Sequence, residues 1–159
     1  MKNSLSTFLV TGAALFAAMQ SVSAADEHGS EAEAEDMVKR AVSVIQREGS
    51  AKAYKAFNEP EGKSFKDKDL FVFVYDFQGN VLASSGIAKV IGKNLIDMKD
   101  ADGQPIVRGV LDMVKKNKKG WYGPYRFSNP RTQEYERKKS YCEQAANDVL
   151  VCVGAYLGR

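Results

Sequence analysis

Histidine is almost absent from this chain, and its single copy, His28, lies in a polar stretch near the N-terminus. Nucleophilic catalysis ordinarily needs a base such as imidazole beside the nucleophile, and protein zinc sites use several Cys and His ligands. The two cysteines, Cys142 and Cys152, form neither a CxxC nor a CxxCH motif. We therefore expect no metal, no cofactor and no enzymatic activity. An enzyme using paired carboxylates such as Asp97 and Asp100 remains the alternative.

Phosphate and calcium motifs are also missing. Gly92-Lys93 lacks the upstream glycine that a phosphate-binding loop requires. Asp100 to Gly103 resembles half of a calcium loop, but Met98 and Gly109 occupy the positions where the first and last ligands belong. The formal net charge is only +3, and most lysines alternate with acids. Such a balance gives no reason to expect a nucleic-acid partner.

Long hydrophobic runs are absent except for residues 8–19, which follow Lys2 and precede the small residues Val22-Ser23-Ala24. This arrangement predicts a signal peptide over residues 1–24 and a periplasmic or secreted protein; an uncleaved membrane anchor is the alternative. The remaining 135 residues carry a net charge of +2 and suffice for one domain. We assign residues 25–34 to a flexible acidic N-terminus and 35–157 to the domain, although helical periodicity already begins at Glu31.

Periodicity predicts two early helices, a hairpin, a third helix and three further strands. Asp102 is expected to cap the third helix, Pro105 to lie in its first turn, and Gly120 to close it. Strands joined by short turns form antiparallel sheets, so the fold class is α+β with helices covering the sheet. The expected helices cover residues 31–47, 51–57 and 105–119, and the expected strands cover residues 70–77, 81–84, 121–127, 136–144 and 149–157.

The pairing expected for the last two strands predicts a disulfide. A hairpin centred on Asn147 places Cys142 directly opposite Cys152, and export permits the bond. Two alternatives remain. A turn centred between Asn147 and Asp148 would set Cys142 against Val153, or the cysteines could stay as buried thiols.

Strand alternation sorts the side chains that precede Cys142. Lys139 and Tyr141 share one face, whereas Lys138, Ser140 and Cys142 share the other. Lys139 would stand over small apolar neighbours, where a lysine needs a partner, and an anionic ligand is one candidate. A lysine reaching the sheet edge with its charge in water is the alternative.

Five segments of the sequence, taken together with their spacing along the chain, resemble the second subtype of the single Cache domain. They read FVYDFQGNVLAS, IGKNLIDMKDADGQPIVR, GWYGPYRFSNP, KKSY and VLVCVGAY, within a match from Glu35 to Tyr156. The resemblance implies a PAS-like antiparallel sheet behind a long N-terminal helix. It also implies sensing of small extracellular molecules, often short carboxylates, usually as the outer part of chemoreceptors, kinases or cyclases.

The resemblance also implies a ligand site. The family's pocket aromatics fall on Trp121, Tyr125 and Phe127, where Phe127 replaces the usual Trp, and Ser84-Ser85 replaces a common His-Pro. Its carboxylate donors fall on Lys139 and Tyr141, and Tyr75 would add an apolar wall. We therefore expect an exported sensory domain that binds a small carboxylate-like ligand and signals through a membrane receptor or kinase. A protein-interaction module that docks through its N-terminal helix is the alternative. The predicted ligand-binding residues are Tyr75, Trp121, Tyr125, Phe127, Lys139 and Tyr141.

Overall fold

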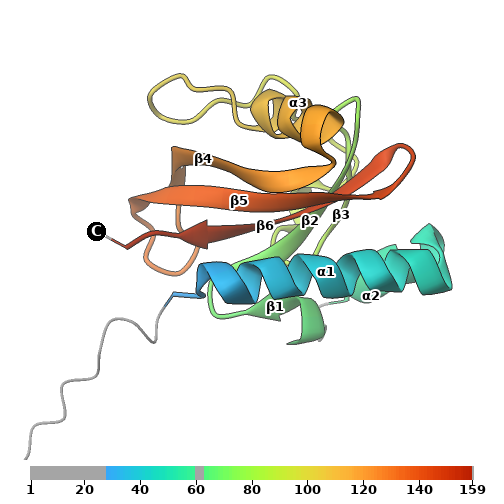
Figure 1. Ribbon diagram of the computed structural model, residues 1–159. Coiled ribbons are helices and arrows are strands. Elements are labelled where there is room, and N and C mark those ends of the chain that lie inside the picture. Colours follow the sequence, from blue (N-terminus) through green and yellow to red (C-terminus); the bar gives the residue numbers. More distant parts are fainter. Residues whose placement is uncertain (1–27, 60–62, 159) are drawn as a thin grey trace, which may run out of the picture.

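The computed structural model describes residues 28–59 and 63–158 (Figure 1). The predicted signal peptide, residues 1–24, lies outside this part of the chain. Two short 3-10 helices, at Lys63–Phe65 and Ala88–Val90, accompany the main elements. These are α1 (Glu31–Glu48), α2 (Ser50–Asn58), β1 (Lys66–Asp67), β2 (Leu70–Asp76), β3 (Val81–Ser84), α3 (Val107–Asn117), β4 (Lys119–Ser128), β5 (Tyr135–Ala146) and β6 (Val149–Tyr156).

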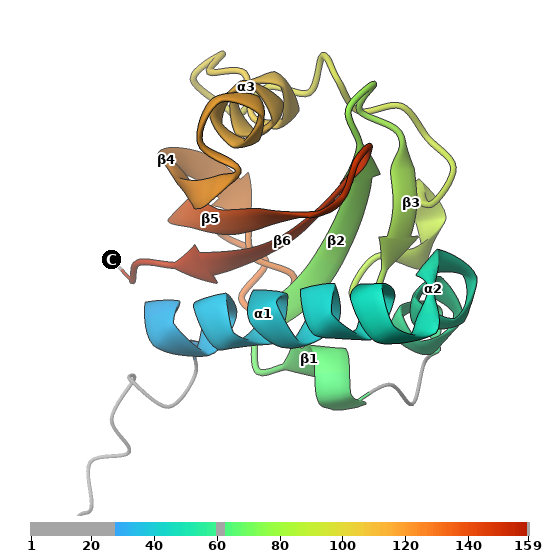
Figure 2. The ribbon, with the colours of Figure 1, turned by 45° about the vertical axis from the view of Figure 1, so that its right-hand side comes forward.

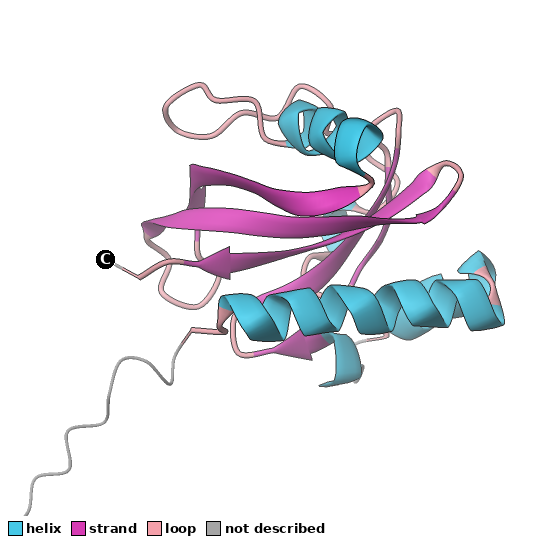
Figure 3. Ribbon diagram, viewed as in Figure 1, coloured by secondary structure: helices cyan, strands magenta, loops and turns pink. Residues whose placement is uncertain are grey.

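The strands form one antiparallel sheet in the order β1-β2-β6-β5-β4, and β3 also pairs with β2. α1 crosses one face of this sheet and α3 lies over the other (Figure 2). The segment that joins β3 to α3 is mostly loop (Figure 3), and Val90, Leu95 and Met98 in it pack against the same core as α3. The predicted α+β class and the antiparallel, PAS-like arrangement are confirmed.

β2 has apolar side chains on both faces, as its nearly continuous hydrophobic sequence predicted. Val72 and Val74 pack into the core beneath α1. Phe73 and Tyr75, the alternate residues, pack with α3 instead. The two faces of one strand therefore supply two separate cores, and the second core contains the candidate site.

α1 begins earlier than the predicted domain boundary. Ser30 and Glu33 form a capping box, in which each side chain accepts a hydrogen bond from the other residue's backbone N–H. Ala34 is fully buried against the sheet. Residues 31–34 thus belong to the helix, and their assignment to a flexible N-terminus was wrong because their acids cap a helix whose apolar face is already packed.

The ends of α3 also differ from the prediction. Ile106 is the N-cap and makes no side-chain capping hydrogen bond, so Asp102 does not cap the helix. Asp100 instead accepts hydrogen bonds from the backbone N–H groups of Asp102 and Gln104 and organises the preceding turn. The helix ends at Asn117, and the next residue, Lys118, has a φ of 67° and provides the left-handed cap that was expected from Gly120.

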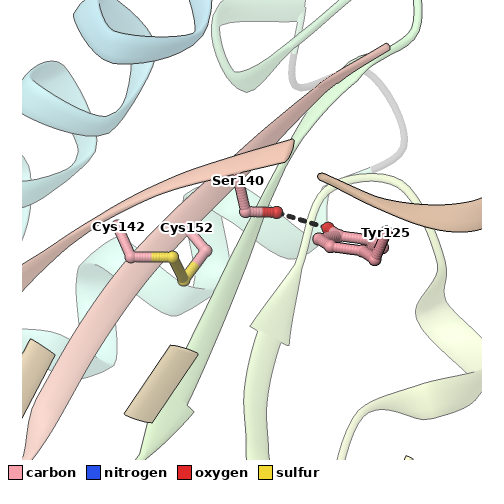
Figure 4. Close-up of a disulfide and its surroundings, with 4 residues drawn as sticks. All are labelled: Tyr125, Ser140, Cys142 and Cys152. Carbon is pink, nitrogen blue, oxygen red and sulfur yellow. Dashed lines mark hydrogen bonds between the residues drawn. A yellow bond between two sulfur atoms is a disulfide. The ribbon is translucent and has the colours of Figure 1, made fainter. Parts of the chain in front are cut away.

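The β5–β6 hairpin has the predicted register. Cys142 pairs with Cys152 and the two form a disulfide with an S–S distance of 2.14 Å and a Cα–Cα distance of 4.2 Å. The alternative that set Cys142 against Val153 is therefore wrong. The innermost pair, Ala146 with Val149, does centre the turn between Asn147 and Asp148, but a register shift at Ala145 restores the predicted pairing. The disulfide joins two neighbouring strands at the wall of the candidate site (Figure 4).

Candidate functional site

An apolar cavity of about 70 Å³ lies between the sheet and the segment that carries α3. The sheet supplies its aromatic and polar lining, and the loop and helix supply aliphatic side chains. A cavity needs about 10–15 Å³ to hold one water molecule, and a water's share of the liquid is about 30 Å³, so this one has room for about two waters or a small ligand. The lining residues are Phe73, Tyr75, Ile87, Val90, Leu95, Met98, Ile106, Val107, Val110, Tyr125, Phe127, Lys138, Ser140, Cys152 and Gly154.

Lys138 is the charged residue of this lining. It is 4% exposed, and its Nζ lies 4.2 Å from the ring centre of Tyr156, 4.8 Å from that of Phe71 and 5.5 Å from that of Phe127. Among the described residues, none accepts a hydrogen bond or forms an ion pair with Nζ. Burial lowers the pKa of Lys138 to about 7, even though two nearby carboxylates oppose the shift.

Because Gly154 has no side chain, it leaves space that the end of the Lys138 side chain occupies. It is paired with Ser140, across β5 and β6. A Cβ atom on Gly154 would come within 2.1 Å of Lys138 Cε, and within 3.1 Å of both Lys138 Nζ and Ser140 Oγ. Lys138 Nζ and Ser140 Oγ are therefore at most about 6 Å apart, and both residues line the cavity.

Three buried hydroxyl-bearing residues, Tyr75, Tyr125 and Ser140, complete the polar part of the lining. Tyr125 OH and Ser140 Oγ are hydrogen-bonded at 2.6 Å (Figure 4). Burial raises the pKa of Tyr125 to about 12, and burial also raises the pKa of Tyr75. Both phenols therefore stay protonated at neutral pH and can donate hydrogen bonds.

The predicted site residues are divided between the two faces of the sheet. Tyr75, Tyr125 and Phe127 line the cavity. Trp121 and Tyr141 lie on the α1 face, with ring centres 5.4 Å apart. The predicted six-residue site is therefore not assembled.

Lys139 also lies on the α1 face. Its Nζ contacts Glu31 Oε2 at 2.6 Å and lies 4.6 Å from the centre of the Trp121 ring. The partner that a lysine on this face requires is thus a glutamate of the first turn of α1. This group of side chains fastens the start of α1 to β5.

A bulge in β4 causes the division. Trp121 pairs with Tyr141, whereas Tyr125 pairs with Lys138, so four steps along β4 match three along β5. The extra residue lies at Gly123-Pro124, whose peptide bond is cis. A regular strand would put Trp121 and Tyr125 on one face, and a bulge reverses that relationship.

Sequence reasoning missed twelve of the fifteen lining residues, among them Phe73, Lys138, Ser140 and Gly154 of the sheet. Alternation had already placed Lys138 and Ser140 on the face of Cys142, opposite Lys139. The available signal was Gly154, because a glycine within the apolar run of β6 marks a close approach of another group. Lys138 is that group.

A buried polar network lies beside the lysine end of the cavity. Asp69 accepts hydrogen bonds from the backbone N–H of Gly29 at 2.8 Å and from Asn129 Nδ2 at 3.3 Å, and its Oδ2 lies 2.6 Å from His28 Nδ1. Asn129 also donates to Glu136 Oε2 at 3.2 Å. The network connects the residues just before α1 to β5, two positions from Lys138.

Metal binding and membrane spanning can be assessed for the described part of the chain, residues 28–59 and 63–158. Within it, no group of three or more His, Cys, Asp or Glu side chains is placed to hold a metal ion. None of its helices is both long and apolar enough to cross a membrane.

The chain belongs to the family described as Single Cache domain 2, which matches residues 3–158. No curated protein matches it in sequence. Three solved structures share its fold. A methyl-accepting chemotaxis protein from Vibrio parahaemolyticus RIMD 2210633 is 21% identical with a TM-score of 0.63, over 79% of this chain and 87% of that one.

The second structure is described as the periplasmic sensor domain of a chemotaxis protein. It is 17% identical with a TM-score of 0.61, over 77% of this chain and 87% of its own. The third is a Cache chemosensory domain solved to explain carboxylic acid recognition. It is 16% identical with a TM-score of 0.59, over 77% of this chain and 85% of its own.

Proposed function

We propose that this chain is an exported sensory domain that binds a short monocarboxylate in the cavity of the α3 face. The observation that carries the proposal is the environment of Lys138. Its buried ammonium group has aromatic neighbours and, among the described residues, no carboxylate within ion-pair distance and no hydrogen-bond acceptor. A bound carboxylate supplies the direct contact with a negatively charged acceptor that this group lacks.

The remaining lining defines the rest of the ligand. Tyr125 and Ser140 offer hydroxyl groups for a second carboxylate contact, and the aliphatic side chains of the loop and α3 suit a short hydrocarbon tail. No further basic side chain and no carboxylate lines the cavity. A dicarboxylate or an amino acid would therefore bury a charged group without a partner, which is costly.

The descriptions of two similar proteins also support this function. One similar structure is a Cache domain described as recognising carboxylic acids, and another is described as a periplasmic sensor domain. Together with the predicted signal peptide, they favour an extracytoplasmic location. A sensory role requires a partner, and we propose a membrane receptor or kinase that contacts the region around α1.

The activity is recognition rather than turnover. The lining offers no carboxylate pair and no imidazole, the groups most often used for general acid–base catalysis.

A thermal-shift screen tests the proposal. The panel contains acetate, propionate, butyrate, succinate, glycine, an aliphatic amine and a purine. A ligand at a hundred times its Kd stabilises the native state by about 2.7 kcal/mol, so a true ligand raises the midpoint clearly. We expect the monocarboxylates to do so in the wild type and not in Lys138→Met. The proposal fails if no monocarboxylate raises the midpoint, or if Lys138→Met responds equally.

A further inference from the structure

The end of the Lys138 side chain has the surroundings of a reactive amine. We propose that Lys138 also forms a reversible imine with small aliphatic aldehydes and ketones, so that the cavity captures carbonyl compounds covalently. The inference rests on the proposed function in one respect, namely that the cavity admits a small organic ligand.

The first argument concerns the hydrogen-bond donors of Lys138 before it reacts. An ammonium group carries three N–H donors, and none of those on Lys138 has an acceptor among the described residues. Buried donors without acceptors are costly. Conversion to an iminium leaves a single N–H, so it removes two of these donors from the cavity.

The second argument is the charge that the product keeps. The aromatic rings of Phe71, Phe127 and Tyr156 lie within 5.5 Å of Nζ and stabilise a cation. An iminium ion is also a cation, and its charge is less concentrated than that of an ammonium. The surroundings that hold the charged lysine therefore hold the product as well.

The third argument is the supply of the nucleophile. Only the neutral amine attacks a carbonyl carbon. Because burial lowers the pKa of Lys138 to about 7, about half of the molecules carry a neutral amine near neutral pH. An ordinary lysine has a neutral fraction about a thousandfold smaller.

The reaction is balanced without any further reagent. The lone pair of Nζ forms a bond to the carbonyl carbon, and the carbonyl oxygen takes up a proton, giving a carbinolamine. The carbinolamine hydroxyl then takes up a proton from solvent and leaves as water, and the nitrogen lone pair forms the C=N bond of an iminium that keeps one N–H. The hydroxyl pair of Tyr125 and Ser140 lies beside this position and can donate to the oxygen as it becomes negative and then leaves.

Hydrophobic surroundings favour the product over the reactants. Water is released in the dehydration step, and a small apolar cavity retains little of it. The tail of a short aliphatic aldehyde would occupy the space assigned above to the tail of a carboxylate. Carbonyl and carboxylate ligands therefore compete for the same cavity.

Reductive trapping tests the inference. The wild-type protein is incubated near neutral pH with propanal and cyanoborohydride, which converts an imine into a stable propylamine, and the modified lysines are mapped by peptide mass spectrometry. We expect Lys138 to be modified at least about tenfold faster than any other lysine, because of its larger neutral fraction. Excess propionate should slow modification of Lys138 alone.

Lys139→Met is the matched control, since Lys139 neighbours Lys138 in sequence but pairs with Glu31 on the other face. It should leave modification of Lys138 unchanged. Modification of Lys138 no faster than that of the exposed lysines overturns the inference. If propionate still raises the thermal midpoint in that case, the carboxylate site stands and only the imine is excluded. If Lys138 is trapped but propionate neither protects it nor raises the midpoint, the imine stands and the carboxylate site falls.

Discussion

Lys138 and Lys139 are consecutive residues of β5 whose ammonium groups lie on opposite faces of the sheet. The first lies among three aromatic rings at the cavity, and the second contacts Glu31 in the first turn of α1 at 2.6 Å. One strand thus touches both the candidate ligand site and the start of the N-terminal helix. A displacement of β5 on ligand binding would act directly on that helix end.

The disulfide should stabilise the fold. In the chain-entropy model, a loop closed between residues ten positions apart contributes slightly under about 3 kcal/mol. Replacing both cysteines by alanine should therefore lower the free energy of unfolding by about that amount. Urea denaturation of the wild type and the double variant measures it. An unchanged midpoint would show that the bond contributes nothing to stability.

Ligand affinity should depend on pH through Lys138. The ammonium form binds a carboxylate, and burial lowers the pKa of the free protein's Lys138 to about 7. Affinity should be constant below this value and should fall by up to about tenfold per pH unit above it. Calorimetric titration with propionate across this range measures the effect. An affinity that does not change above neutral pH would contradict the charge assignment.

Lys138 should also make the free energy of unfolding depend on pH, and this free energy should rise with pH whereas ligand affinity falls. Its folded-state pKa lies below the unfolded value of about 10.4, so between about 7 and 10.4 the unfolded state binds more protons. The free energy of unfolding of the wild type should therefore rise with pH relative to that of Lys138→Met. The titratable groups around Lys138 are Asp69, Tyr125 and Tyr156 from neighbouring elements and Glu136 from β5 itself, with His28 beside Asp69. Their contributions cancel to a first approximation in this comparison.

Asp69 should hold the segment that precedes α1. The carboxylate is 2% exposed and accepts the hydrogen bond of the Gly29 amide. Asp69→Ala should cost about 1.5–3 kcal/mol of unfolding free energy, in keeping with a buried charged hydrogen bond. Hydrogen exchange at the Gly29 amide should accelerate. Asp67→Ala, at an exposed position of β1, is the control and should change neither quantity.

Local patterns predicted the parts of the fold that depend on regular geometry. The pairs from Lys138–Tyr156 to Gln144–Leu150 keep one register, so counting residues placed Cys142 opposite Cys152 correctly. The apolar run of β2 likewise indicated a strand covered on both faces. These predictions held because alternation and pairing follow directly from an uninterrupted strand.

The site could not be read in the same way because it depends on irregular geometry. One extra residue at Gly123-Pro124 separates Trp121 from Tyr125 across the sheet. Choosing between Lys138 and Lys139 required knowing which face each helix covers, and the periodicity of β5 does not contain that information. Asp102 failed as a helix cap for a related reason, since Asp100 organises the turn.

The most direct measurement is a calorimetric titration of propionate into three proteins: the wild type, Lys138→Met and Lys139→Met. Charged hydrogen bonds contribute about 1.5–3 kcal/mol, so Lys138→Met should weaken binding about tenfold to a hundredfold. Lys139→Met should bind as the wild type does, because Lys139 pairs with Glu31 on the other face. Equal affinity of Lys138→Met and the wild type, or a loss confined to Lys139→Met, would contradict the placement of the ligand.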